Sequence, residues 1–262
     1  MEKENINFGH FQTEVIGTFV YVFIIGWSRM VGEAFNSDYM ETAIVTGLVY
    51  SIMATLSLKL SGGHFNPAVS FTLVLCEKMT LWKGLSYIFA QIIGSFMGSS
   101  LVAYTVSIPL MDKARSSSVL GIPRIRTDYG FGQISAFIAE ACGSAFIMAM
   151  YWVSTRDNTI SENLKGYILG VSVAVGTMCF YNVSGACFNP MLVLGPSFVA
   201  RTIRDYHWIY WFGPIVGMLS IGLFMNHFEK ENGDFMKKKK LTEEEEANAE
   251  AGPLNSGAIQ TV

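Results

Sequence analysis

Two Asn-Pro pairs are the residues of this chain whose type and position have the clearest chemical meaning. Asn66-Pro67-Ala68 recurs as Asn189-Pro190-Met191, 123 positions further along, and both copies stand in strongly apolar sequence. Unpaired backbone groups are costly in hydrocarbon, so a broken helix at that depth normally lines a cavity. Two breaks at matching positions of two halves indicate a substrate path near the middle of a bilayer.

The composition is that of a membrane protein. Of 262 residues, 51% are hydrophobic and only 15% are charged, whereas soluble domains carry about a quarter charged residues. Residues 84–111 and 166–200 contain no charged side chain, and about 20 apolar residues suffice to span a bilayer. The net charge of −3 implies no nucleic-acid partner. The four cysteines lie in apolar stretches without metal-ligand spacing, and we expect buried thiols and neither metal nor cofactor.

The elements that must position the Asn-Pro pairs are apolar helices. Two short apolar pieces, 66–76 and 189–200, are each about half as long as a bilayer crossing. Asn is a good helix cap and proline is tolerated at the first helical position, so both pieces are predicted to be half-helices that begin at the motif. Six full spans are predicted at about residues 9–29, 41–60, 83–107, 131–154, 165–183 and 206–228.

The two halves of the chain repeat each other beyond the tripeptides. Since each half holds three spans, an odd number, the halves must insert with opposite topology and form an inverted repeat. The matching residues are Tyr87 with Tyr210, Phe89 with Phe212, Gly94 with Gly217 and, near the start of each half, Glu14 with Glu140.

The orientation in the membrane is ambiguous from charge alone. The positive-inside rule assigns the loop holding Lys113, Arg115, Arg124 and Arg126 to the cytoplasm, and it assigns the run Lys237–Lys240 to the same side. Six spans put these segments on opposite sides. Residues 229–262, with their charged runs, are predicted to be a disordered tail.

The region from about residue 9 to 228 resembles the aquaporin, or major intrinsic protein, family. The resemblance implies an all-α membrane protein, a right-handed bundle of six transmembrane helices with two re-entrant half-helices. It also implies a homotetramer with one pore per subunit, cytoplasmic termini, and passive conduction of water and, in some members, of small uncharged solutes. The residues that carry it are Glu14, SGGHFNPAV (61–69), Gln91, Glu140, SGACFNPM (184–191) and Gly195-Pro196.

The physics of the half-helices agrees with this resemblance. Two half-helices that meet tip to tip direct their positive dipole ends at mid-channel and repel cations there. The amides of Asn66 and Asn189 can donate to a passing water oxygen. By resemblance, the backbone carbonyls of the preceding loops form a ladder of acceptors: Gly62, Gly63, His64 and Phe65, then Gly185, Ala186, Cys187 and Phe188.

Glu14 and Glu140 are acidic residues inside apolar spans, and such carboxylates are functional-site candidates by default. A proton relay is one interpretation. We favour a structural one, in which each carboxylate, helped in the first half by Gln91, accepts hydrogen bonds from a re-entrant loop, as in the family. The His64 side chain is likewise interpreted as a brace for its loop.

The second motif departs from the family, which normally continues Asn-Pro-Ala-Arg with an arginine at the cation-rejecting constriction. Met191 and Leu192 stand there instead, and neither Arg201 nor Arg204 is close enough along the chain to replace it. By resemblance the other filter positions fall at Thr46, Thr177 and Ala186. The ring is therefore predicted to be wide and free of arginine, to pass glycerol, urea or ammonia, and to exclude protons or cations less well.

Helical spacing places four more residues on the cytoplasmic half of the path: Tyr21, Tyr50, Ile147 and Val173. The two tyrosines are bulky, and this half is a candidate gate. Cys187, beside the filter, is a candidate site for block by mercurials. Met191 is interpreted as a flexible gap-filler between the half-helix tips.

The sequence predicts a passive channel in the plasma membrane or an internal (vacuolar or vesicular) membrane, with water, small neutral solutes and the lipid bilayer as its partners. A secondary transporter would need an ion-coordinating carboxylate at the bilayer midplane, and it is disfavoured because Glu14 and Glu140 are given structural roles. An enzyme is disfavoured because hydrolase, metalloprotease and nucleotide motifs are missing. A gated or poorly conducting homologue with a structural, adhesion or ion-leak role stays open as the alternative.

Overall fold

The computed structural model describes residues 7–35, 39–114, 119–157 and 159–250. Its regular elements are all helices, and these described ranges contain no β-strand. The predictions that concern residues 1–6, Arg115 and residues 251–262 lie outside the described part. The helices are α1 (Phe8–Phe35), α2 (Tyr39–Ser57), α3 (Pro67–Leu75), α4 (Leu81–Thr105), α5 (Ile108–Ala114), η1 (Val119–Gly121), η2 (Thr127–Tyr129), α6 (Gln133–Arg156), α7 (Glu162–Ser184), α8 (Met191–Val199) and α9 (Ile209–Glu250).

Six of the described helices are long and apolar enough to cross a bilayer: α1, α2, α4, α6, α7 and the Ile209–Gly233 part of α9. This confirms the six predicted spans, whose ends agree within a few residues except at two points. The last span was predicted to end at residue 228, whereas the apolar part of α9 continues to Gly233. The first span was predicted to end at residue 29, and α1 continues to Phe35.

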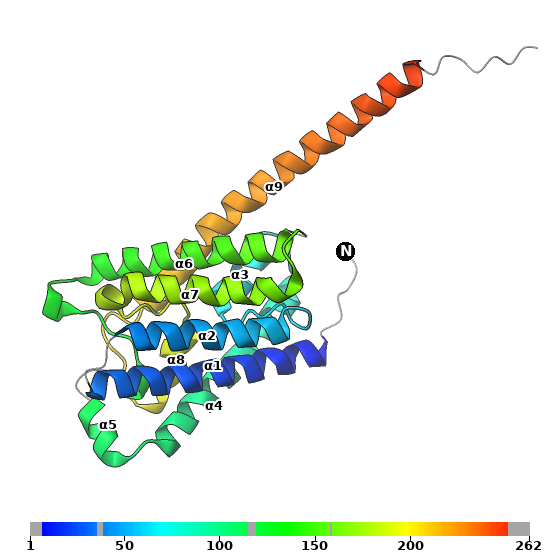
Figure 1. The fold of residues 1–262 in the computed structure, drawn as a ribbon. Helices are drawn as coiled ribbons and strands as arrows, with labels where there is room; N and C mark the ends of the chain where they lie inside the picture. The colour runs from blue at the N-terminus through cyan, green and yellow to red at the C-terminus, as the bar shows by residue number, and fades with distance from the viewer. Residues whose placement is uncertain (1–6, 36–38, 115–118, 158, 251–262) are drawn as a thin grey trace, which may run out of the picture. The chain divides into compact units, whose positions relative to one another are not determined.

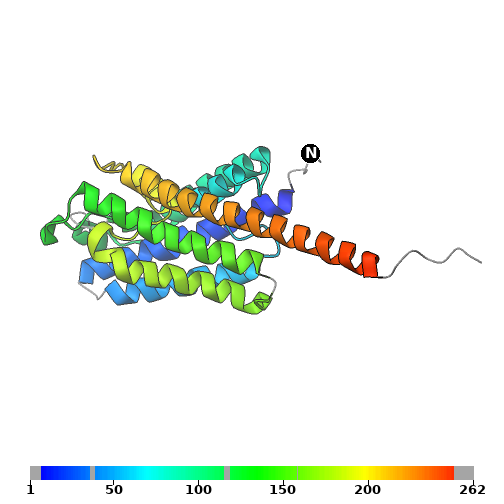
Figure 2. The same ribbon diagram turned by 90° about the horizontal axis from the view of Figure 1, so that it is seen from above.

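The order long, long, short, long occurs twice, as α1–α2–α3–α4 and α6–α7–α8–α9. Helix α2 packs against α7, α1 packs against α4 and α2, and α6 packs against α7 (Figure 1). The view from above shows the long helices α1, α2, α6 and α7 running lengthwise beside one another (Figure 2). The short helices α3 and α8 are the predicted re-entrant half-helices.

Small residues allow the closest helix contacts. A Cβ added at Gly94 of α4 would lie 2.5 Å from the Val15 carbonyl of α1, and one added at Gly217 of α9 would overlap the Ala141 carbonyl of α6. Since these glycines match in the repeat, each half uses the same device to bring its last span against its first.

The chain divides into two compact units, Met1–Leu223 and Phe224–Val262. In its described residues the second unit is the C-terminal part of α9, which ends at Glu250. The sequence predicted disorder from residue 229. The helix there has a simple local reason, because Lys, Glu and Ala dominate residues 237–250 and are strong helix formers.

Candidate functional site

The tip of the first half-helix is built around Asn66. Its side-chain oxygen accepts from the Ala68 amide at 3.0 Å and caps α3, with Pro67 as the first helical residue. Its side-chain nitrogen donates to the Phe188 carbonyl of the other half at 2.8 Å. The Asn66 side chain therefore both caps α3 and joins the two halves of the chain.

The second tip repeats this geometry. The Asn189 oxygen accepts from the Met191 amide at 3.0 Å, and its nitrogen donates to the Phe65 carbonyl at 2.8 Å. The structure thus brings the two Asn-Pro motifs together through reciprocal hydrogen bonds. Each amide nitrogen keeps a second hydrogen, which has no acceptor among the described residues.

The loops before the two tips have unusual backbone conformations. Three non-glycine residues are left-handed, Phe65 (φ 47°), Ala186 (φ 47°) and Phe188 (φ 52°), together with glycines at 62, 63 and 185. Such conformations are strained for residues with a Cβ and persist only where surrounding contacts enforce them. The phenyl rings of Phe65 and Phe188 lie against Gly17 and Gly143, where any side chain would collide with the ring.

Glu14 supplies those contacts for the first loop. Its fully buried carboxylate accepts from the Ser61 hydroxyl (2.6 Å), the His64 amide (3.1 Å) and the Phe65 amide (2.8 Å). The Gln91 amide donates to it as well, at 2.8 Å. A carboxylate with this many donors can hold a loop whose own amides have no helical partner.

Glu140 holds the second loop in the same way. It accepts from the Ser184 hydroxyl (2.5 Å), the Cys187 amide (2.8 Å) and the Phe188 amide (2.7 Å). Two tyrosines at matching positions of the repeat also hold these loops. Tyr87 donates to the Ser61 carbonyl (2.9 Å), and Tyr210 donates to the Ser184 carbonyl (2.7 Å). The sequence analysis recorded this pair as part of the repeat and assigned it no role.

His64 and Met191, two further residues near the half-helix tips, are buried and contact neighbouring side chains. The His64 ring nitrogen Nδ1 lies 2.9 Å from the Ser70 hydroxyl, and the ring packs edge-on against Tyr87. Met191 is fully buried, and its carbonyl accepts from the Ser95 hydroxyl at 2.6 Å.

The four predicted filter positions, Thr46, Thr177, Ala186 and Leu192, are all buried. The Thr46 hydroxyl donates to Thr42 of its own helix (2.6 Å), and the Thr177 hydroxyl donates to Val173 (2.8 Å). Since each hydroxyl has one hydrogen, the oxygen lone pairs that remain can only accept. Ala186 and Leu192 add small or apolar side chains.

One of the predicted filter positions, Ala186, is contacted by an arginine that the sequence analysis did not indicate. Arg29 of α1 donates from Nη2 to the Ala186 carbonyl at 2.6 Å, and the residue is 1% exposed. The sequence reading took Arg29 for the residue that ends the first span. Because α1 continues for another turn and a half, Arg29 lies inside it.

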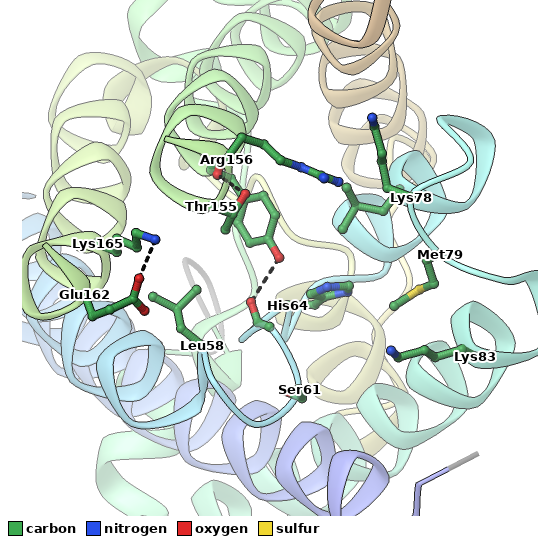
Figure 3. A pocket seen from close by; sticks show the side chains of 13 residues that line it. Leu58, Ser61, His64, Lys78, Met79, Lys83, Thr155, Arg156, Glu162 and Lys165 are labelled. Carbon is green, nitrogen blue, oxygen red and sulfur yellow. Dashed lines mark hydrogen bonds and ion pairs between the residues drawn. The ribbon is translucent and has the colours of Figure 1, made fainter. Parts of the chain in front are cut away.

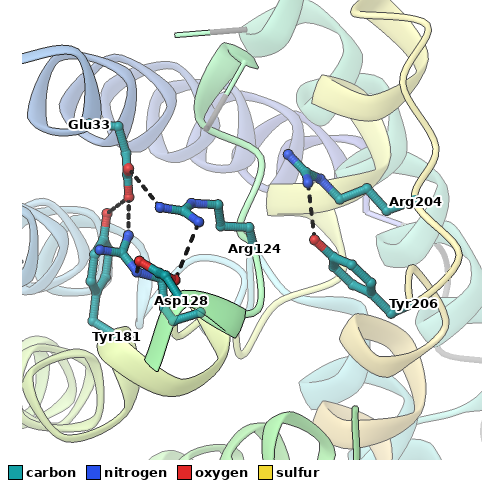
Figure 4. Close-up of polar contacts among 7 residues, drawn as sticks. Glu33, Arg124, Asp128, Tyr181, Arg204 and Tyr206 are labelled. Carbon is teal, nitrogen blue, oxygen red and sulfur yellow. Dashed lines mark hydrogen bonds and ion pairs between the residues drawn. The ribbon is translucent and has the colours of Figure 1, made fainter. Parts of the chain in front are cut away.

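Arg29 lies at the base of a polar cluster, here called the arginine mouth: Arg29, Glu33, Arg124, Arg126 and Tyr181, which line a small cavity with Pro123 and Gly185. Figure 4 shows the Glu33 carboxylate at its centre. Glu33 pairs with Arg126 at 2.5 Å and with Arg124 at 3.5 Å. Burial lowers the pKa of the Arg126 guanidinium, but Glu33, together with Tyr129, Asp128 and Tyr181, more than offsets this and the pKa lies above its ordinary value.

The four predicted lining residues of the other half, Tyr21, Tyr50, Ile147 and Val173, are all buried. The Tyr50 hydroxyl lies 3.3 Å from both the Gly63 and the His64 carbonyl oxygens. The Tyr151 hydroxyl donates to the Gly62 carbonyl at 3.0 Å. Tyrosine hydroxyls therefore occupy the carbonyls of the first loop, and the sequence had not indicated Tyr151.

Beyond these tyrosines lies a larger cavity of about 270 Å³, here called the lysine cavity (Figure 3). Its charged side chains are mostly basic, with Glu162 paired to Lys165 at 2.5 Å. Its lining residues include Ser61, Gly62, His64, Lys78, Lys83, Tyr151, Arg156, Glu162 and Lys165.

Comparison with known proteins agrees with this geometry. The family model described as Major intrinsic protein matches residues 2–225. Aquaporin-8 of Rattus norvegicus is 30% identical over 220 residues, which cover 82% of this chain and 79% of that protein. Aquaporin TIP4-4 of Zea mays is 28% identical over 225 residues, covering 81% of this chain and 85% of the relative.

A solved structure with a similar fold is the X-ray structure of the aquaglyceroporin from Plasmodium falciparum. Its TM-score is 0.74, and the match covers 83% of this chain and 94% of that one. The sequence identity is 24%, so this likeness shows the fold alone.

Six apolar spans, two half-helices and the family match together define a multi-pass integral membrane protein. The chain belongs to the major intrinsic protein family. This confirms the predicted class, a membrane channel for water and small solutes and not an enzyme.

Proposed function

We propose that the chain conducts water and small uncharged solutes passively, with glycerol, urea and ammonia as the candidate solutes. The observation that carries this proposal is the reciprocal pair of hydrogen bonds from Asn66 to the Phe188 carbonyl and from Asn189 to the Phe65 carbonyl, each 2.8 Å long. It supports a path on which two helix N-termini and two free amide hydrogens converge. Positive dipole ends disfavour cations, and the amides bind a water or hydroxyl oxygen.

The filter chemistry supports passage of solutes larger than water. Thr46, Thr177, Ala186 and Leu192 carry no ring, in contrast to the aromatic and histidine of water-selective members. The threonine oxygens accept hydrogen bonds, whereas the Arg29 guanidinium donates them. A glycerol molecule, whose hydroxyls both donate and accept, satisfies both kinds of group while its carbon face meets Leu192.

The test is stopped-flow permeability of purified protein in liposomes, toward water and each of the three solutes. We expect water and at least one solute to pass. Thr46→Phe with Thr177→His, which restores the bulk of a water-selective ring, should reduce solute flux and leave water flux measurable. Water permeation with complete rejection of all three solutes would contradict the solute proposal.

We further propose a homotetramer with one pore per subunit and cytoplasmic termini, in the plasma membrane or an internal membrane. The proposed domains are an N-terminal segment 1–8, a channel domain 9–228 with repeats at about 9–107 and 131–228, and a cytoplasmic tail 229–262. Exposed apolar side chains on the outer faces of the spans, among them Ile44, Leu48 and Ile52 of α2, support contact with lipid or with neighbouring subunits.

A gated form of the same channel is the second candidate. The observation in its favour is that the hydroxyls of Tyr50 and Tyr151 occupy the Gly62, Gly63 and His64 carbonyls, on which a water file would depend. Zero permeability of folded, reconstituted tetramers to water and to every solute would favour a non-conducting structural or adhesion role instead.

A further inference from the structure

One arginine of the arginine mouth differs from the others in lacking an acidic partner. The only carboxylate lining this cavity is Glu33, one helical turn beyond Arg29, and it is engaged by Arg124 and Arg126. Among the described residues, Arg29 makes one hydrogen bond, to the Ala186 carbonyl, and forms no ion pair. We infer that Arg29 supplies, from α1, the fixed positive charge and the donors of the filter, in place of an arginine on α8. This inference rests on the proposed channel function.

The electrostatic part of the inference follows from burial. Arg29 is 1% exposed, and an arginine side chain stays protonated in proteins. A buried charge without a counter-ion is costly unless other polar groups or water solvate it. The buried Glu140 interacts electrostatically with Arg29 but forms no direct ion pair with it. The field of a guanidinium without a direct ion pair is strong where water is scarce, so a cation beside the Ala186 carbonyl meets a large barrier.

The donor part follows from the atoms that have no partner. Nε and Nη1 of Arg29 are buried and have no hydrogen-bond acceptor among the described residues. The adjoining cavity measures about 10 Å³, about the smallest space that holds one water. A water oxygen in this cavity would satisfy one of these donors at a time, because Nε–H and the Nη1 hydrogens point to different sides of the planar guanidinium.

The usual source of this charge is absent from α8. Leu192, at the position where the family places its arginine, is apolar and 3% exposed. The second re-entrant loop nevertheless presents the Ala186 carbonyl, left-handed at φ 47°, to a guanidinium. The Ala186 carbonyl thus accepts from an arginine of α1 and not from one of α8. The competing interpretation is that Arg29 only braces this loop.

The experiment separates charge from bracing. Arg29→Gln keeps a donor for the Ala186 carbonyl and removes the charge, and Arg29→Met removes both. In purified tetramers in liposomes, proton flux under an imposed potential is measured with an enclosed pH dye, and water flux by stopped flow. We expect about tenfold or greater proton leak in both variants, and wild-type leak in Arg201→Gln, which removes an exposed arginine after α8.

A second variant guards against misfolding. Adding Leu192→Arg to Arg29→Met returns a charge to the family's usual position, and we expect it to lower the leak toward the wild-type level. If Arg29→Gln conducts water and stays as proton-tight as the wild type, Arg29 is only a brace and the inference is overturned. If the wild type conducts no water, the proposed function fails instead, which is a distinguishable result.

Discussion

Tyr50 offers the sharpest test of how the path closes at the end near the lysine cavity. Its ring is buried, packs edge-on against Tyr21 with ring centroids 5.5 Å apart, and places one hydroxyl between two loop carbonyls. Tyr50→Phe removes that hydroxyl and keeps the ring. Tyr50→Ala removes the ring as well. We expect both variants to conduct water faster than the wild type, with the alanine variant faster than the phenylalanine variant.

The size of the effect follows from the hydrogen-bond geometry. The hydroxyl has one hydrogen, and both carbonyl oxygens lie 3.3 Å away, beyond the ordinary range for O–H···O bonds. A shared bond of this length contributes about 1 kcal/mol at most. Since about 1.4 kcal/mol corresponds to a factor of ten, loss of the Tyr50 hydroxyl should raise water permeability by up to about fivefold.

The measurement is stopped-flow light scattering on liposomes, normalised to the amount of folded tetramer. Tyr104→Phe is the matched control, because it removes the same hydroxyl from a tyrosine that is 86% exposed. If both Tyr50 variants conduct at the wild-type rate, the tyrosine hydroxyl neither blocks the carbonyls nor closes the path, and the gating interpretation fails.

Three other predictions concern block and folding. Cys187→Ser should abolish block by mercurials, because the buried thiol lies 3.1 Å from the Asn189 carbonyl; retained sensitivity in a water-flux assay would exclude this site. Glu140→Ala should lower the Tm of the purified protein strongly, because three donors lose their acceptor at about 1–3 kcal/mol each; the exposed Glu41→Ala should leave Tm unchanged, and equal values for both would refute the loop-holding role. Gly217→Leu should prevent folding, since a side chain there collides with backbone, whereas Gly233→Leu should not; a folded, conducting Gly217→Leu would show that this contact is not required.

The half-helices and their meeting could be predicted because their signals are local. An asparagine that caps, a proline that starts a helix and an apolar stretch too short to span are each legible within a few residues. Repetition of the motif then implies that Asn66 and Asn189 are related by the symmetry of the halves. The hydrogen bonds of Glu14 and Glu140 followed from resemblance to the family and from the cost of an unpartnered carboxylate in an apolar span.

Arg29 could not be found in this way. A charged residue at the end of an apolar stretch is usually taken as the end of a span. The first span was therefore predicted to end at Arg29 itself. Its contact with Ala186 joins positions 157 residues apart, and no local pattern encodes that distance. The weaker signal available was Glu33, one turn further along, which shows that α1 carries charge on the turn after Arg29.

The two halves are alike in the hydrogen bonds at the half-helix tips, but they differ in the donors that bind their loop carbonyls. In the first loop these carbonyls accept from neutral tyrosine hydroxyls, one of them at 3.3 Å to both of its acceptors, and such weak bonds can exchange for water at little cost. In the second loop the Ala186 carbonyl accepts from a buried cation at 2.6 Å, a charge-assisted bond of about twice the strength. The inverted repeat therefore gives the proposed path two different ends: a neutral end whose weak hydrogen bonds suit opening and closing, and a charged, rigid end that suits discrimination. This difference between the two ends does not require an arginine on α8. The Ala186 carbonyl, which binds the guanidinium, belongs to the second loop, so an arginine from α1 can reach it.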